Sequence, residues 1–293
     1  MKPVVYLTLF TLCLLCGCRK ENSVASDQPV YPVKFNVLSI TQQQMESRST
    51  VLSEGEAESP IHYLYYLIYG SDSKFVKKIE QTDDVDSFGT IADSEPAGNY
   101  TVIMIGSKNA LQITPGSATT GVFKCSAVDD DVFFLKTPVT IDSQGLTKDI
   151  TLNRVVCYLQ AQIEDQIPAD VARVELSVRT DASTFSFGTE KVRAEPSTDL
   201  TTSKTVAKSM VTDEDRQNVT LGMTILNDAV PMKVMIAFFD SSNTIIKLVT
   251  SDDVPFERNK RTILSGKLFT MPTAGFTVTV NSEWSTDPIQ IVL

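Results

Sequence analysis

Leu15-Cys16-Gly17-Cys18 is the stretch whose residue types predict a definite chemical modification. A mostly apolar run from Val4 to Leu15 precedes it, and Lys2 places a positive charge before that run. Gly17 is the small residue that a signal peptidase needs just before its cut. The pattern therefore predicts a bacterial lipobox. In that chemistry the thiol of Cys18 takes a diacylglycerol through a thioether, the chain is cut before Cys18, and the new amine is acylated.

This reading divides the N-terminal region into a signal peptide at residues 1–17 and a polar tether at residues 18–29. The apolar run is too short to span a bilayer, which argues against a permanent transmembrane helix. Several acyl chains, at about 0.8 kcal/mol per buried CH₂, anchor a protein far more firmly than one chain. The alternatives for Cys18 are a plain secretory signal cleaved nearby and a buried N-terminal strand.

Two further cysteines, Cys125 and Cys157, lie in the body of the chain. Both sit in apolar contexts typical of strands, where cysteine often serves as a small hydrophobic residue. An oxidising cell envelope would also allow them to form a disulfide, so the sequence leaves their pairing open. No Cys/His spacing typical of a transition-metal site is present.

The residue types that usually carry catalysis or bind cofactors form no known catalytic motif in this chain. His62 is the only histidine of the chain, and it lies within an aromatic strand-like run. No GxSxG, HExxH or P-loop pattern accompanies it. The acidic groups Asp83-Asp84 and Asp129-Asp130-Asp131 would need several more oxygen ligands to hold Ca²⁺, so solvated turns are favoured. We therefore predict a protein that is not an enzyme and has neither cofactor nor metal.

The charge balance narrows the range of partners. The formal net charge is −10 and the isoelectric point is about 4.7. A nucleic-acid binder needs a clustered basic face that neutralises phosphates. The composition therefore argues against a nucleic-acid partner and fits an acidic protein displayed at a surface.

Short β-type runs separated by Gly, Pro, Asp, Asn and Ser dominate the chain, and strongly helical windows are few. This texture predicts an all-β protein built of antiparallel sandwiches. The predicted strands of the first half are Val33–Ile40, Ile61–Tyr69, Tyr100–Gly106, Asp131–Leu135, Pro138–Asp142 and Asp149–Leu152. Those of the second half are Tyr158–Glu164, Ala172–Arg179, Val219–Leu226, Val230–Asp240, Ile245–Thr250, Arg261–Leu268 and Phe276–Val280.

Two of these runs also predict burial. The alternation in Val230–Phe238 places its large apolar residues on one face, which should be core. The run Ile61–Tyr69 is apolar or aromatic on both faces, so its strand should be covered on both sides. Weak helical signals occur near Asp213–Arg216 and Asn109–Leu111.

The best boundary within the body lies near residues 143–150, where a polar stretch separates two β-type runs. We therefore divide the body into an N-terminal sandwich at 30–147 and a C-terminal sandwich at 148–271. The remaining segment, 272–293, would be a final strand or a donor strand.

The order and texture of these strands resemble the fimbrillin superfamily of Bacteroidales, over nearly the whole chain. The features that carry the resemblance are the lipobox with Arg19-Lys20-Glu21, Tyr65-Tyr66-Leu67-Ile68-Tyr69 with Lys74-Phe75-Val76, Gly98-Asn99-Tyr100-Thr101-Val102, Leu152-Asn153-Arg154-Val155-Val156-Cys157-Tyr158-Leu159, Pro168 to Val178, Phe256-Glu257-Arg258-Asn259-Lys260-Arg261-Thr262, Leu264-Ser265-Gly266-Lys267-Leu268 and Phe276 to Trp284. The resemblance implies two transthyretin-like antiparallel β-sandwich domains in tandem. It also implies assembly by strand exchange, in which a neighbour's extended segment fills an open edge and apolar groove.

The resemblance singles out two regions. Family subunits bound for the shaft are cut by an Arg-specific protease after the first strand, and Arg48, followed by Ser49, occupies a matching place. The alternative is an ordinary loop arginine, as in anchor subunits that keep their lipid. At the C-terminus, Ile289, Ile291 and Leu293 share one face of a possible donor strand. The alternative there is the last strand of the protein's own second sandwich, with Trp284 in its core.

The sequence thus predicts a lipid-anchored fimbrial subunit at the cell outer membrane that contributes to adhesion or biofilm formation. Its expected partners are the outer membrane, reached through the lipid, other fimbrial subunits, and host or bacterial surface ligands. The competing function is a surface glycan-binding lipoprotein with β-sandwich domains. Sugar sites usually present exposed aromatic platforms, whereas the aromatic residues of this chain mostly fall at strand positions that predict core.

Overall fold

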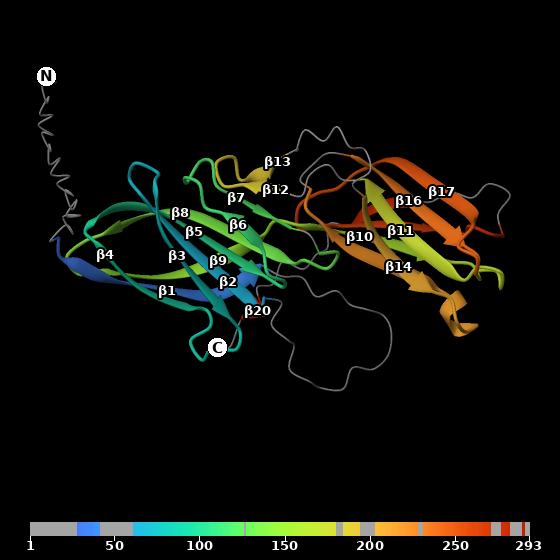
Figure 1. The fold of residues 1–293 in the computed structure, drawn as a ribbon, viewed down its shortest axis with the longest axis horizontal. Coiled ribbons are helices and arrows are strands. Elements are labelled where there is room, and N and C mark those ends of the chain that lie inside the picture. The colour runs from blue at the N-terminus through green and yellow to red at the C-terminus, as the bar shows by residue number, and fades with distance from the viewer. Residues whose placement is uncertain are drawn as a thin grey trace, which may run out of the picture.

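The structure is a computed structural model that describes residues 28–41, 61–125, 127–179, 184–193, 203–227, 231–270, 277–281 and 289–290. This part of the chain is almost entirely β-strand (Figure 1). The strands to residue 154 are β1 (Val30–Thr41), β2 (Tyr63–Gly70), β3 (Phe75–Thr82), β4 (Thr90–Pro96), β5 (Gly98–Ser107), β6 (Gln112–Thr114), β7 (Val122–Lys124), β8 (Val132–Ile141) and β9 (Leu146–Arg154). The later strands are β10 (Cys157–Ile163), β11 (Arg173–Arg179), β12 (Thr184–Ser186), β13 (Lys191–Arg193), β14 (Ser203–Ser209), β15 (Val219–Ile225), β16 (Met232–Phe239), β17 (Ile245–Val254), β18 (Arg261–Gly266), β19 (Thr277–Asn281) and β20 (Ile289–Gln290).

Within the described residues the strands form four sheets. The large sheet has the order β20-β1-β9-β8-β5-β2-β3, with β4 also paired to β1. The small sheet has the order β13-β12-β7-β6, the β10 sheet the order β15-β10-β18-β19, and the β11 sheet the order β14-β11-β16-β17. The one helical element of this part of the chain is the 3₁₀ turn η1 at Glu214–Arg216. No helix there is long and apolar enough to cross a membrane.

The large sheet folds back on itself into two layers. β8 pairs with β9 through Phe133–Arg154 and Phe134–Asn153, at the start of β8 and the end of β9. β1, β4 and β9 lie on one side of this junction, and β8, β5, β2 and β3 lie on the other. A core of buried residues from both layers fills the space between them, including Phe35, Ile91, Tyr66 and Met104.

The opposite face of β2 and β5 is also covered, by the small sheet (Figure 1). Tyr65, Leu67 and Tyr69 of β2 pack there with Phe123 of β7 and Phe185 of β12. Every residue of β2 from Leu64 to Tyr69 is buried, so the predicted cover on both sides of this run is confirmed. The hairpin β12–β13 follows β11 in the chain, but its strand β12 pairs with β7. This pairing connects the two halves of the molecule.

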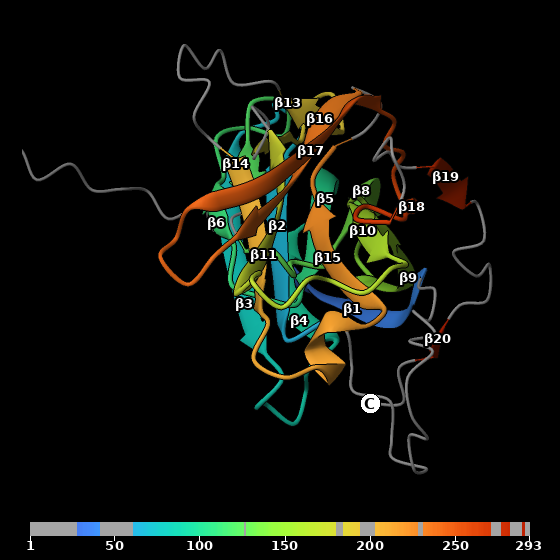
Figure 2. The ribbon, with the colours of Figure 1, turned by 90° about the vertical axis from the view of Figure 1, so that its right-hand side faces the viewer.

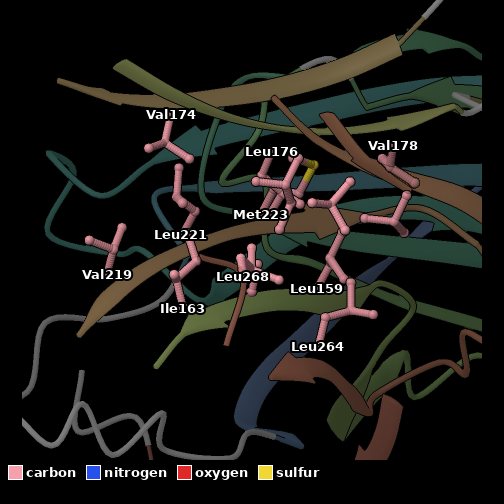
Figure 3. Close-up of a cluster of buried hydrophobic side chains, with 14 of the residues drawn as sticks. Leu159, Ile163, Val174, Leu176, Val178, Val219, Leu221, Met223, Leu264 and Leu268 are labelled. Atoms are coloured by element: carbon pink, nitrogen blue, oxygen red, sulfur yellow. The ribbon is translucent and has the colours of Figure 1, made fainter. Parts of the chain in front are cut away.

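The β10 sheet and the β11 sheet face each other across a third core (Figure 3). Leu159 and Leu264 come from the first of these sheets, and Val174, Leu176 and Val178 come from the second. In β16 the residues Met232, Val234, Ile236 and Phe238 are buried, as the alternation predicts. The reason is geometric, because successive side chains of a strand point to opposite faces.

The structure confirms an all-β protein and differs from the sequence analysis in detail. The predicted strands Asp131–Leu135 and Pro138–Asp142 form the single strand β8. β9 runs across residue 148, pairs with β1, and ends at Arg154, so the change from the large sheet to the β10 sheet follows that residue. The helical signal at Asp213–Arg216 corresponds to η1, whereas the signal at Asn109–Leu111 was wrong because those residues are not helical.

Cys125 and Cys157 are buried, and neither forms a disulfide within the described residues. The Cys125 thiol donates to Asp130 Oδ2 over 3.3 Å, and the Cys157 thiol donates to the carbonyl of Ile225 over 3.2 Å. Burial raises the pKa of the Cys125 thiol, and the charge of Asp130 raises it further. Asp130 itself is buried, so a solvated turn was the wrong expectation for this residue.

Candidate strand-pairing site

β1 is the strand on which the candidate site is built. Its residues Val33, Phe35 and Val37 are buried, while Lys34 between them and Leu38 after them are exposed. This alternation of apolar and solvent-facing side chains explains why the segment is a strand with one face on the core. β1 therefore contributes both backbone hydrogen bonds and core side chains to the large sheet.

Each edge of β1 has a different partner. On one edge β1 runs parallel to β9, from the pair Val33–Leu146 to the pair Thr41–Asn153. On the other edge it runs antiparallel to β4, from Val30–Pro96 to Asn36–Thr90. Removal of β1 would therefore leave unpaired backbone on both β9 and β4, together with an apolar groove.

The C-terminal strand β20 completes the second edge of β1. The contact with the β4 side ends where the Val37 amide donates to the Gly89 carbonyl over 2.8 Å. Beyond this point a bulge follows Val37, and β20 pairs antiparallel with β1 through Ser39–Gln290 and Ile40–Ile289 (Figure 2). Two segments far apart in the chain thus share one edge of β1.

The surroundings of β1 are apolar on the core side and polar on the outside. The Phe35 and Tyr66 ring centroids lie 5.7 Å apart across the two layers. Burial raises the pKa of the Tyr66 phenol, and the charge of Asp93 raises it further. On the outer face the Asn36 amide donates to Asp149 Oδ1 over 2.7 Å, which links β1 to β9.

Most of the site residues singled out by sequence fall outside the described part of the chain. These are Cys18, Arg48, Ser49, Ile291 and Leu293. β1 ends at Thr41, seven positions before Arg48 in the sequence. Ile289 belongs to β20, so the structure brings the C-terminal segment to the strand that precedes Arg48. β20 joins the large sheet, whereas β19 pairs with β18 of the β10 sheet.

The sequence analysis missed β3 and β4, although β4 is the partner of most of β1. The Thr90–Pro96 segment contains Asp93 and Glu95 at core-facing positions, where apolar residues normally signal a strand. The only sequence signal for this strand was the every-second-residue spacing of Ile91, Asp93 and Glu95, which share one face. Charge at these positions hid that periodicity.

Comparison with solved structures finds folds like this one. A "putative adhesin" from Bacteroides ovatus is similar at 15% identity with a TM-score of 0.51, over 84% of this chain and 88% of that one. A "putative cell adhesion protein" from Bacteroides ovatus is similar at 10% identity with a TM-score of 0.50, over 91% of this chain and 99% of that one. At these identities the likeness shows the fold alone.

The fimbrial anchor protein Mfa2 from Porphyromonas gingivalis has a TM-score of 0.49 at 11% identity, over 89% of this chain and 99% of that one. The search of curated proteins found no match. A family model described as a family of unknown function matches residues 111–291, from the loop before β6 through β20. Because that match covers more than half of the sequence, the chain belongs to this family, DUF6562.

Proposed function

We propose that the protein is a lipid-anchored fimbrial subunit that joins other subunits by strand pairing and contributes to adhesion or biofilm formation. The proposal places it at the cell outer membrane through Cys18, exposed at the surface, with its two halves acting as tandem transthyretin-like sandwiches. Its partners would be other fimbrial subunits and surface ligands of host or bacterial cells.

The observation that carries this proposal is the divided edge of β1. β4 pairs with the first part of β1 through seven residue pairs, and β20 pairs with the end of β1 through two residue pairs. An extended segment from another subunit can supply the same backbone hydrogen bonds as β20. A head-to-tail contact of this kind does not close on itself, so its repetition builds a filament.

The proposal assigns the protein no enzymatic role. The Nδ1 atom of His62, just before β2, contacts the Asp83 carboxylate, just after β3. The two residues are also joined through the backbone, because the Asp83 amide donates to the His62 carbonyl over 3.0 Å. This arrangement supports a role in holding the β2–β3 hairpin together.

A glycan-binding role is the competing function, and the aromatic residues of β2 give it little support. Tyr63 and Tyr65 are stacked with an interplanar angle of 9°, as a sugar platform would require. Tyr65, however, is buried, and its hydroxyl accepts a hydrogen bond from the Leu111 amide over 3.0 Å. Because Tyr65 is covered by the chain and Tyr63 is only partly exposed, the pair does not offer an open two-ring platform to a sugar.

The test is the N-terminus and mass of the protein recovered from cells, measured separately in membrane and sheared-filament fractions. A processed filament subunit would begin at Ser49 in the filament fraction, and Arg48→Ala would abolish that N-terminus. Arg19→Ala, in the tether, is the matched control and should leave it unchanged. An anchor subunit would carry lipidated Cys18 in the membrane and co-purify with filament proteins. A protein with lipidated Cys18 and no fimbrial partner in either fraction would contradict the proposal.

A further inference from the structure

β3 and β4 are two end strands of the large sheet that meet along a line we call the seam. β3 pairs with β2, and β4 pairs with β1. Across the seam, side chains join the two strands in the described structure. Gln81 donates to the Thr90 carbonyl over 2.8 Å and accepts from the Gly89 amide over 3.1 Å. Lys77 of β3 reaches Asp93 and Glu95 of β4.

The three charged residues of the seam lie very close together. Lys77 Nζ is 2.9 Å from Asp93 Oδ1 and 2.7 Å from Glu95 Oε1. Each carboxylate side chain is 6% exposed, whereas the Lys77 side chain is 38% exposed. Two buried carboxylates therefore share one ammonium group. Burial of this kind is costly for charged groups and favours neutral forms.

The apolar core of the first half borders the cluster. Lys77 lies opposite Ile68 in the β2–β3 pairing, and Asp93 lies opposite Val33 in the β4–β1 pairing. Tyr66 is fully buried beside the cluster, since the charge of Asp93 raises the pKa of its phenol in addition to the effect of burial. Such surroundings lower the local dielectric and exclude water.

The oxygens of Asp93 are placed differently. Oδ1 accepts the hydrogen bond of Lys77 and also that of the Ser94 amide over 2.8 Å. Oδ2 is buried and accepts a hydrogen bond from neither of these two donors. Oδ1 is thus held by donors that would stabilise negative charge during attack on the carboxyl carbon, while Oδ2 is the oxygen free to leave. The amine nitrogen lies 2.9 Å from Oδ1, which is bonded to that carbon, so the reacting groups already lie side by side.

We propose that Lys77 and Asp93 form an intramolecular isopeptide bond, with Glu95 transferring the proton between the reacting groups. A proton first passes from the ammonium, by way of Glu95, to Oδ2 of Asp93, which leaves a neutral amine and a neutral carboxylic acid. The Lys77 Nζ–Asp93 Cγ bond then forms, and the bond from Cγ to Oδ2 breaks. Glu95 accepts a proton from Nζ and returns it to the departing oxygen, which leaves as water. Nothing is oxidised or reduced, and no other reactant is needed.

The starting state of this reaction is the ion pair. Burial lowers the pKa of the Lys77 ammonium, the hydrogen bonds to Asp93 and Glu95 raise it, and the net direction is upward. Proton transfer within the pair keeps the total charge of the cluster constant. The product replaces a buried charge pair by a neutral amide and ties the two strands of the seam covalently. This inference does not depend on the proposed fimbrial function.

Peptide mass spectrometry of the full-length folded protein is the test. Proteolysis should yield a branched peptide that joins the Lys77 segment to the Asp93 segment, lighter by one water than the two separate peptides. Fragmentation must show both sequences in one ion, because loss of water within the Asp93-Ser94 segment alone would give a linear peptide. Linear peptides only, in protein whose fold is verified by circular dichroism, would overturn the proposal and leave an ion pair.

Variants separate the roles of the residues. Lys77→Arg should abolish the branched peptide. Glu95→Gln keeps the side-chain shape but removes the proton carrier, so the branch should form about a hundredfold more slowly after synthesis, followed as the fraction of branched peptide with time. Lys78→Arg is the matched control, because Lys78 pairs with Glu80 on the same strand, and it should form the branch like wild type. An unchanged rate in Glu95→Gln would overturn the role of Glu95.

Discussion

The seam between β3 and β4 and the outer edge of β17 are two sheet margins that the molecule treats in opposite ways. At the seam, Lys77, Asp93 and Glu95 point inward and join two strands through charge. β17 ends the β11 sheet, and its residues Ile245 and Leu248 are each 53% exposed. One margin thus carries inward charge, and the other carries outward apolar side chains.

The difference shows how sequence chemistry decides what an unpaired edge can do. Inward charges are a known protection against edge-to-edge pairing, because a strand that carries them cannot join another sheet without burying them. An exposed apolar edge has no such protection and favours contact with another surface. The seam should therefore matter for the stability of the fold, whereas β17 should matter for association.

The largest expected effect is at the seam. Lys77→Ala leaves the Asp93 and Glu95 carboxylates buried together without their partner, and we expect a loss of at least about 3 kcal/mol in the free energy of unfolding. The matched control is Lys78→Ala, which removes a partly exposed pair with Glu80 and should cost about 0.5 kcal/mol. Urea denaturation of the two variants measures both values. Equal losses would mean that the buried cluster contributes no more than a surface ion pair.

A second charge, Asp165, tests whether inward charge also stabilises the half of the molecule that contains β17. Its carboxylate accepts backbone N–H groups of Leu268, Phe269 and Thr270 over 2.9, 2.6 and 2.8 Å. Asp165→Asn should lower the free energy of unfolding by about 2 kcal/mol at pH 7, because hydrogen bonds to a charged acceptor are the stronger ones. A loss as small as that of Lys78→Ala would contradict this role.

The same residue predicts a pH dependence. Burial raises the pKa of Asp165, the hydrogen bonds from residues 268–270 lower it, and the net direction is downward. Its contribution is therefore fully present above the unfolded pKa of about 3.9 and is lost as the pH falls through the lower folded value. The stability difference between wild type and Asp165→Asn should narrow below about pH 4. A constant difference from pH 7 to pH 2 would contradict it.

The smallest expected effect on stability is at β17. Ile245→Lys and Leu248→Lys change exposed side chains, so each should alter the free energy of unfolding by less than about 0.5 kcal/mol. Both should reduce any self-association, which sedimentation velocity at increasing protein concentration measures. Thr250→Lys, at an exposed polar position of the same strand, is the control. A large loss of stability in the first two would show that this edge belongs to the core.

The strands that sequence reasoning found and missed differ in their chemistry. The apolar residues of β2 and β16 occur at the positions that are buried. Both strands, and the faces on which they are buried, were therefore predicted from the sequence. β3 and β4 place charged or amide groups at core-facing positions, and the short strands β6, β7, β12 and β13 offer too few residues for a period. For the candidate site, the sequence predicted that β1 and the C-terminal segment are strands. It did not predict that these two strands pair with each other.

The sequence by itself determined the all-β character and the buried faces of the longer strands, because alternation is a local property of an extended chain. The tertiary structure decided the rest. It folded the large sheet into two layers and brought Ile289 to Ile40. It also set Lys77 against Asp93, sixteen residues away, across a seam between two strands that are not paired with each other. Such contacts depend on how the sheets close, and a buried charge can be placed only where that closure supplies its partner.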